Sequence, residues 1–312
     1  MMKKTSSLVM LVIIIALLFP TQGVKAASKD LSMYFIESSH NSYKADATLL
    51  RCGDKNVLID AGAKSSGNMV NIVKSKATKT GNIVYLEAVI ISHPHNDHAA
   101  GIIDLLNDPQ IKIKKIYRDN YSKLKNTGYK YKTQAWWIQL NELIKKNNVP
   151  VEVLSNKETS ININGTAITL YRPIKIFTDL TSTANVNNSS IIVTVNCSSN
   201  GLSGLFLGDL ESAAIQSIKD DPYYYNICSR PYTVCKMGHH GVRKETVLLE
   251  KNFYDQELKC TYLIATSKKE NLVENDFYKK LDPATQNKIA AFNSGDKAIY
   301  VGRAKTLSHI TK

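Results

Sequence analysis

The feature that most constrains this chain is a dense cluster of metal-ligand residues that directly follows a short apolar run. Residues 89–103 have the sequence VIISHPHNDHAAGII, so three histidines and one aspartate fall within positions 93–98. Imidazole nitrogen and carboxylate oxygen are ligands that zinc and related divalent metals take. The apolar residues predict a buried strand, and the small residues after the cluster predict a helix from Ala99. The segment therefore predicts a metal site at the end of a strand.

The spacing within this cluster predicts two neighbouring ions. Side chains in an extended segment alternate with a period of two, so His93 and His95 point the same way and can share one ion. Asp97 and His98 follow at the turn into the helix, where they can reach a second ion. A histidine-rich loop without metal is the alternative. Zinc is expected from the ligand types, and manganese would suit an open, oxygen-rich site.

Polar residues of the same kind end three other predicted strands. Asp60 ends the apolar segment LIDA and is expected to orient a ligand histidine from behind, with an ordinary turn aspartate as the alternative. Asp209 leaves the apolar segment LFLGDLE, where a carboxylate can bridge two cations. His239 and His240 lie in GHHG, so two strand-end clusters hold five of the seven histidines. A random scatter would not produce that pattern.

A turn rich in asparagine and serine, residues 187–190, directly precedes a further predicted strand. Its amide and hydroxyl groups are suited to hold an anionic group, which makes Asn188 and Ser189 candidate substrate-binding residues. The alternative is a turn that uses asparagine only for its backbone preference.

The amino-terminal residues predict an exported protein. Lys3 and Lys4 precede an apolar run at 8–18, and VKA at 24–26 has the small-residue spacing of a signal-peptidase site. We expect cleavage after Ala26, which gives a secreted, extracellular or cell-wall-associated protein without a membrane span. A retained amino-terminal anchor is the alternative. The rest, residues 28–312, shows no composition break and is expected to form one domain.

The charge of the chain favours anionic partners. The chain carries +13, and loss of Lys3, Lys4 and Lys25 with the signal peptide removes three positive charges and no acid, leaving +10. Such a protein is attracted to polyanions such as DNA or an anionic wall polymer. Solvated lysines that need no partner are the alternative, and no stable protein partner is expected. The five cysteines are interpreted as small core residues, with Cys228 and Cys235 as the one candidate for a local disulfide.

These segments together resemble the motifs of the metallo-β-lactamase superfamily, in order and at ordinary separations, over nearly the whole mature chain. The resemblance implies an α/β fold, a four-layer αββα sandwich with two metals at one edge between the sheets. It also implies the ligands: His93 and His95 for one metal, Asp97 and His98 for the other, Asp209 as the bridge, and His239 or His240 as the last ligand. Asp97 and His240 are the candidate catalytic residues. Whichever histidine of the pair is not a ligand is expected to protonate the leaving oxygen.

One departure from the superfamily pattern narrows the function. Many members supply a third histidine to the first metal, but no histidine lies between His98 and His239 in this sequence. The segment NNSSIIV in its place is similar to the subgroup that contains the hydrolase domain of the DNA-uptake channel ComEC and the wall-associated phosphorylcholine esterases. True β-lactamases keep the missing histidine, so the resemblance argues against antibiotic hydrolysis.

The expected function is therefore metal-dependent hydrolysis of phosphodiester or phosphoester bonds, of the nuclease or phosphorylcholine-esterase type. Two alternatives remain at this point. One is hydrolysis of a lactone or carboxylic ester at the same metal site. The other is a binding protein that contains metal but does not catalyse a reaction.

Overall fold

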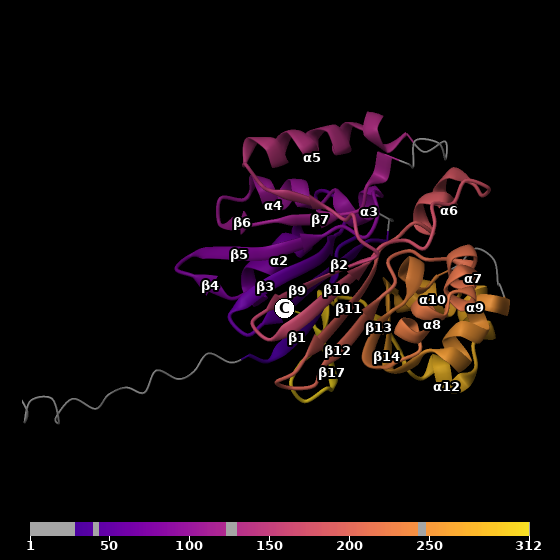
Figure 1. Ribbon diagram of the computed structural model, residues 1–312. Coiled ribbons are helices and arrows are strands. Elements are labelled where there is room, and N and C mark those ends of the chain that lie inside the picture. The colour runs from indigo at the N-terminus through magenta and orange to yellow at the C-terminus, as the bar shows by residue number, and fades with distance from the viewer. Residues whose placement is uncertain (1–28, 40–43, 123–129, 243–247, 312) are drawn as a thin grey trace, which may run out of the picture.

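The computed structural model describes residues 29–39, 44–122, 130–242 and 248–311. Two β-sheets pack face to face, and helices cover the outer face of each sheet (Figure 1). The predicted four-layer αββα sandwich is thus confirmed. The predicted signal peptide at 1–26 lies outside the described residues. Within the described part of the chain, no helix has the length and apolar character needed to span a membrane.

The first sheet is built mainly from the amino-terminal half of the chain. Its strands run in the order β17-β16-β1-β2-β3-β5-β7-β8, with β4 and β6 also paired to β5. Their bounds are β1 (Leu31–Glu37), β2 (Asp46–Cys52), β3 (Lys55–Ala61), β4 (Lys79–Thr80), β5 (Ile83–Ile90), β6 (Ile111–Ile113), β7 (Ile116–Arg118), β8 (Val151–Val153), β16 (Ala298–Val301) and β17 (Leu307–Ile310). Strands β3, β5, β7 and β8 are parallel, so their carboxyl ends meet at one edge.

The second sheet repeats this arrangement with the carboxyl-terminal half. Its order is β15-β14-β13-β12-β11-β10-β9. The bounds are β9 (Glu158–Ile163), β10 (Thr166–Tyr171), β11 (Ile192–Cys197), β12 (Ser203–Phe206), β13 (Pro231–Lys236), β14 (Lys259–Lys268) and β15 (Ile289–Phe292). Strands β12 to β15 are parallel, and their carboxyl ends also share one edge.

Helices on the outer faces complete the sandwich. In Figure 1, α5 and α4 lie on the side of the first sheet, and α7 to α12 lie on the side of the second. The bounds are α2 (Gly67–Lys76), α3 (Asn96–Ala99), α4 (Ile102–Asn107), η2 (Tyr131–Thr133), α5 (Ala135–Lys146), α6 (Ser182–Asn187), α7 (Ser212–Asp220), α8 (Pro222–Cys228), η3 (Gly238–Gly241), α9 (Leu248–Asn252), η4 (Phe253–Glu257), α10 (Lys269–Val273), α11 (Asp276–Lys280) and α12 (Pro283–Gln286).

Three apolar cores hold the layers together, and strand alternation explains how one strand serves two of them. In β1, Leu31, Met33 and Phe35 pack between the sheets, whereas Tyr34 and Ile36 pack under the helices. The helices add their own apolar stripe. In α5, for example, the buried residues are Trp137, Leu140 and Ile144, which fall on one helical face.

The five cysteines are free thiols, and four of them are buried. The alternative of a disulfide between Cys228 and Cys235 is therefore wrong for this structure. Burial in an apolar layer raises the pKa of the Cys228 thiol to about 12, as expected of a small core residue rather than a reactive one.

Gly101 generates a prediction about the support of the metal-motif helix. Its N–H donates to the carbonyl of Gly62 at 2.9 Å, and a Cβ at Gly101 would collide with the backbone carbonyl of Ala61. Gly101→Ala should lower the free energy of unfolding by about 1–3 kcal/mol because overpacking forces the backbone to move. Gly67→Ala, which has open space around its Cβ, should lower it not at all or raise it by up to about 1 kcal/mol. Urea unfolding of both variants tests the contrast, and equal effects would contradict it.

Candidate metal centre

The candidate residues come together because the parallel strands of both sheets end at the same edge, where open α/β sheets bind ligands. In the first sheet, Asp60 lies near the end of β3, and the histidine motif at 93–98 follows β5. In the second sheet, Asp209 follows β12 and His240 follows β13. Residues far apart in the sequence therefore face each other across the sandwich.

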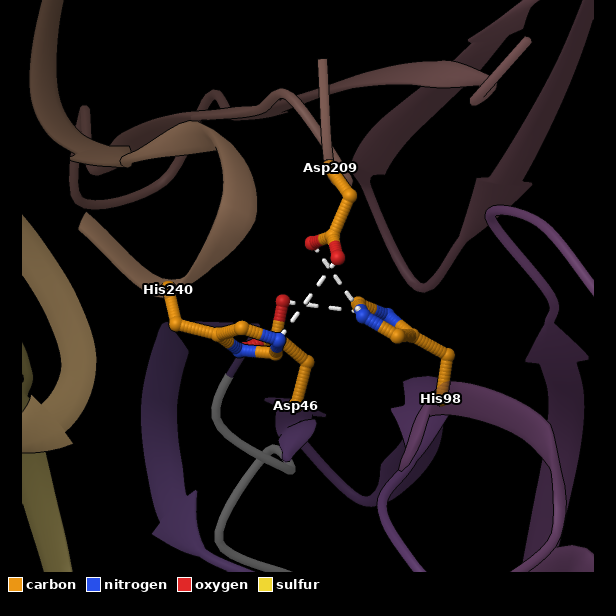
Figure 2. Close-up of side chains that lie close together, drawn as sticks. All are labelled: Asp46, His98, Asp209 and His240. Atoms are coloured by element: carbon orange, nitrogen blue, oxygen red, sulfur yellow. Dashed lines mark hydrogen bonds and ion pairs between the residues drawn. The ribbon is translucent and has the colours of Figure 1, made fainter. Parts of the chain in front are cut away.

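Two groups of side chains lie close enough to hold a metal ion, and they share Asp209. Figure 2 shows one of these groups, Asp46, His98, Asp209 and His240, whose side chains point toward one another. Within each group, one ligand atom per residue lies within 4.8 Å of every other: His93, His95 and Asp209 in the first, and Asp46, His98, Asp209 and His240 in the second. A carboxylate common to both groups is placed to bridge two ions.

The first group contains two histidines in their uncharged form. His93 Nε2 lies 3.0 Å from His95 Nδ1 and 3.8 Å from Asp209 Oδ2. Burial lowers the pKa of His95 to about 4 and that of His93 well below its usual value. Neutral imidazole is the form that binds metal. The other ring nitrogen of His93, Nδ1, lies 3.0 Å from Ser92 Oγ and 3.2 Å from Ser190 Oγ.

His98 is oriented from behind by Asp60. The Oδ2 atom of Asp60 lies 2.8 Å from His98 Nδ1, and on the other side of the ring His98 Nε2 lies 3.1 Å from Asp209 Oδ1. Asp60 is itself held by the backbone N–H of Ser92, which donates to Oδ1 at 2.8 Å. Its backbone has φ 53° at the irregularity between β2 and β3. This is the position that the sequence predicted for an orienting carboxylate.

His240 is oriented in the same way by Asp46. Its Nδ1 lies 3.0 Å from Asp46 Oδ1, and its Nε2 lies 3.2 Å from Asp97 Oδ2 and 3.5 Å from Asp209 Oδ2. The Nε2 atom of His240 therefore faces Asp97 and Asp209, the two carboxylates that the sequence predicts to be metal ligands.

The sequence left open which histidine of GHHG is the ligand, and the structure separates them. Both residues have positive φ, 48° for His239 and 61° for His240, which turns their side chains apart. The His240 side chain is 3% exposed and faces the cluster, whereas that of His239 is 33% exposed and its Nδ1 lies 2.7 Å from Glu211 Oε1. His240 is thus the residue placed to hold a metal.

The buried polar atoms fit a cation. Among the described residues, His98 Nε2 and Asp209 Oδ1 have no hydrogen-bond partner although both are fully buried. They lie 3.1 Å apart without hydrogen-bonding geometry, as two atoms directed at a common point would. Burial alone would raise the pKa of Asp209, but His98, His240 and Lys236 hold it well below its usual range. The carboxylate is therefore charged, and imidazole with carboxylate suits zinc.

Sequence reasoning missed Asp46 and Lys236, which both lie within the centre. Asp46 is the first residue of β2, and Ala47 pairs with Ala61, so Asp46 lies at the same edge as Asp60. Lys236 is the last residue of β13 and is only 3% exposed. A charged residue at the end of an apolar strand, just before GHHG, was the signal that could have identified it.

Asn188 and Ser189 lie next to the centre, but their side chains bond to the protein itself. Asn188 Oδ1 accepts from the N–H groups of Glu211, at 3.1 Å, and Ala214, at 2.9 Å, at the start of α7. Ser189 Oγ donates to the carbonyl of Asn185 at 2.7 Å. Their substrate-binding role stays a prediction, while the structure assigns them the support of α6 and α7.

The histidine pair supplies a matched test of metal binding. His240→Ala should lose about one equivalent of bound metal, because its Nε2 faces the ligand carboxylates. His239→Ala, one residue away and directed at Glu211, should retain its metal. Elemental analysis of both purified variants after dialysis against zinc measures the difference. Equal metal content in the two variants would refute the assignment.

The pKa shifts predict how the metal-free protein responds to pH. Burial alone would lower the pKa of His240, but Asp209 and Asp46 raise it from 6.5 to about 9. A raised folded-state pKa contributes stability that is complete below pH 6.5 and is lost as the pH rises to about 9. The melting temperature in a chelator should therefore fall across this window, and His240→Gln should reduce the slope. A melting temperature that rises over the window would contradict the prediction.

Comparison with known proteins agrees with this geometry. Residues 43–159 match the family model described as the metallo-beta-lactamase superfamily. No curated protein matches the sequence.

Among solved structures, the metallo-beta-lactamase fold protein YhfI from Bacillus subtilis is similar with a TM-score of 0.53 and 12% identity, over 88% of this chain and 99% of that one. A diphosphatase from the PhnP family has a TM-score of 0.48 and 11% identity, over 87% and 98% of the two chains. Zinc-bound PqqB from Methylobacterium extorquens has a TM-score of 0.43 and 10% identity, over 66% and 72%. The chain therefore matches the metallo-β-lactamase superfamily model over residues 43–159 and has the metallo-β-lactamase fold.

Proposed function

We propose that the protein is a binuclear metal-dependent hydrolase of phosphodiester or phosphoester bonds. The observation that carries the proposal is the position of Asp209, whose carboxylate belongs to both ligand groups. One carboxylate between two sets of histidines is the arrangement that holds two cations a few ångströms apart.

In this proposal the ions are held by His93, His95, His98, Asp209 and His240. Asp97 lies outside both groups, but its Oδ2 lies 3.2 Å from His240 Nε2, so the proposal includes it as a ligand. When bound, two divalent ions supply an activated water at neutral pH and neutralise charge on the attacked phosphoryl group. Asp60 and Asp46 fix the rings of His98 and His240 through their Nδ1 atoms, so that both Nε2 atoms stay directed inward.

His239 does not point into the ligand groups, so in this proposal it is available to act on the leaving group. Its side chain is partly exposed, and its Nδ1 lies 2.7 Å from Glu211 Oε1. The carboxylate of Glu211 at Nδ1 is placed to keep the His239 ring oriented. His239 is thus the group in this proposal that protonates the leaving oxygen.

Two features of the chain support a phosphorylated substrate. The ligand group of His93 and His95 lacks a third histidine, since no histidine lies between His98 and His239, and Ser190 Oγ lies 3.2 Å from the outer ring nitrogen of His93. The chain also carries +13, which favours anionic substrates.

The proposal includes an exported protein whose substrate lies outside the cell. The basic start and apolar run of residues 1–26 support this localisation. The resemblance of the 187–193 segment to ComEC-type hydrolase domains and phosphorylcholine esterases supports DNA or an anionic wall polymer as the substrate.

A substrate panel tests the reaction class. Zinc-loaded or manganese-loaded protein should hydrolyse bis-p-nitrophenyl phosphate, and a chelator should abolish the activity. A lactone and a β-lactam in the same panel should not be turned over at a comparable rate. Activity on the lactone alone would contradict the proposal.

Removal of the shared carboxylate tests the mechanism. Asp209→Ala should reduce turnover of bis-p-nitrophenyl phosphate at least about 100-fold, because even outer partners of metal ligands cost 10–100-fold. It should also release about one metal ion and keep the circular dichroism spectrum. Asp54→Ala is the matched control, since Asp54 is exposed in the turn at the far end of the β2–β3 hairpin. Full activity of Asp209→Ala would show that this carboxylate does not bridge the metals.

A further inference from the structure

Lys236 is a buried cation inside a cluster of acids, and the proposed reaction does not use it. Its Nζ donates to the carbonyl of Gly208 at 2.8 Å, contacts Asp46 Oδ2, and lies 3.6 Å from Asp209 Oδ1. Burial alone would lower the pKa of Lys236, but Asp46 and Asp209 raise it, so the side chain is an ammonium ion. An ammonium has three N–H donors. The Gly208 carbonyl and the Asp46 carboxylate are in direct contact with Nζ, whereas Asp209 Oδ1 is attracted to it over a longer distance.

The carboxylates around His98 and His240 fall into two classes according to the ring nitrogen that they face. Asp209 faces the Nε2 atoms of both rings, at 3.1 Å and 3.5 Å. Asp46 faces the Nδ1 atoms, at 3.8 Å from His98 and 3.0 Å from His240. A metal held by the Nε2 atoms therefore lies on the side of Asp209 and not on the side of Asp46.

Both oxygens of Asp46 are already engaged. Oδ1 accepts from Thr266 Oγ1 and lies 3.0 Å from His240 Nδ1, while Oδ2 contacts the ammonium of Lys236. Asp46 lies close enough to the cluster to be a metal ligand by distance alone. Its hydrogen bonds instead make it the partner of His240.

We propose that Lys236 is a positioning residue that keeps Asp46 out of the metal coordination and holds it as the orienting partner of His240. The same ammonium fixes the Gly208 carbonyl, which precedes the bridging Asp209 in the chain. Lys236 thus joins a carboxylate of the first sheet to the bridging segment of the second. This inference rests on the metal centre of the proposed function.

The test uses cobalt(II) in place of zinc, because its visible absorption reports the number and type of ligands without any turnover. Lys236→Met should change the absorption spectrum of the cobalt-loaded protein, because Asp46 loses its cation and becomes free to coordinate. It should also weaken zinc binding about 10–100-fold. Lys236→Arg keeps the charge and should restore most of the native spectrum.

A double variant keeps the test informative if Lys236→Met folds poorly. Asp46→Asn with Lys236→Met removes both charges and keeps a side-chain oxygen for His240 Nδ1, so its spectrum should be closer to the native one than that of Lys236→Met. Lys219→Met is the matched control. Lys219 lies on α7, and its Nζ forms an ion pair with Glu257 Oε1 at 2.6 Å instead of with the residues of the metal centre. This control should leave the spectrum unchanged.

Three results would overturn the inference. In the first, Lys236→Met has the native cobalt spectrum and zinc affinity. In the second, Asp46→Asn with Lys236→Met departs from the native spectrum further than Lys236→Met alone. In the third, the native protein binds no cobalt, which would also remove the proposed function, whereas the first two would leave that function standing.

Discussion

The structure depends on burying several charged side chains close together between the two sheets. Asp46, Asp60 and Asp209 are each 4% exposed or less, and they lie beside the fully buried His98. An isolated buried carboxylate is strongly unfavourable unless it is paired or bound to a metal. Here each acid faces a histidine, and Asp46 and Asp209 also lie beside the ammonium of Lys236. Divalent cations at the centre would complete that compensation.

The backbone of the site is held in conformations that isolated residues avoid. Asp60, His239 and His240 all have positive φ, which costs about 1–3 kcal/mol for each non-glycine residue. Packing in the three apolar cores that join the layers contributes the free energy of folding that offsets this strain. The strained positions are also the ones that aim Asp60 at His98 and turn His240 away from His239. Strain here fixes the direction of functional side chains.

Local sequence patterns predicted much of this arrangement. They missed features that depend on contacts between residues far apart in the sequence or on backbone and side-chain conformation. The HPHNDH motif was recognisable because its ligands lie within six consecutive residues. Asp60 and Asp209 were recognisable because each lies at the end of an apolar strand. The position of Asp46 depends on strand register between distant segments, which no local pattern shows, whereas the local signal for Lys236 was its charge at the end of an apolar strand. The difference between His239 and His240 depends on two unusual φ angles. The side chains of Asn188 and Ser189 bond to nearby backbone, a direction that the turn composition did not reveal.

The most direct test of the account is anomalous diffraction from crystals of the zinc-loaded protein at the zinc absorption edge. We expect two peaks, one near His93 and His95 and one near His98 and His240, with the Asp209 carboxylate between them. A single peak, or metal bound away from Asp209, would contradict it.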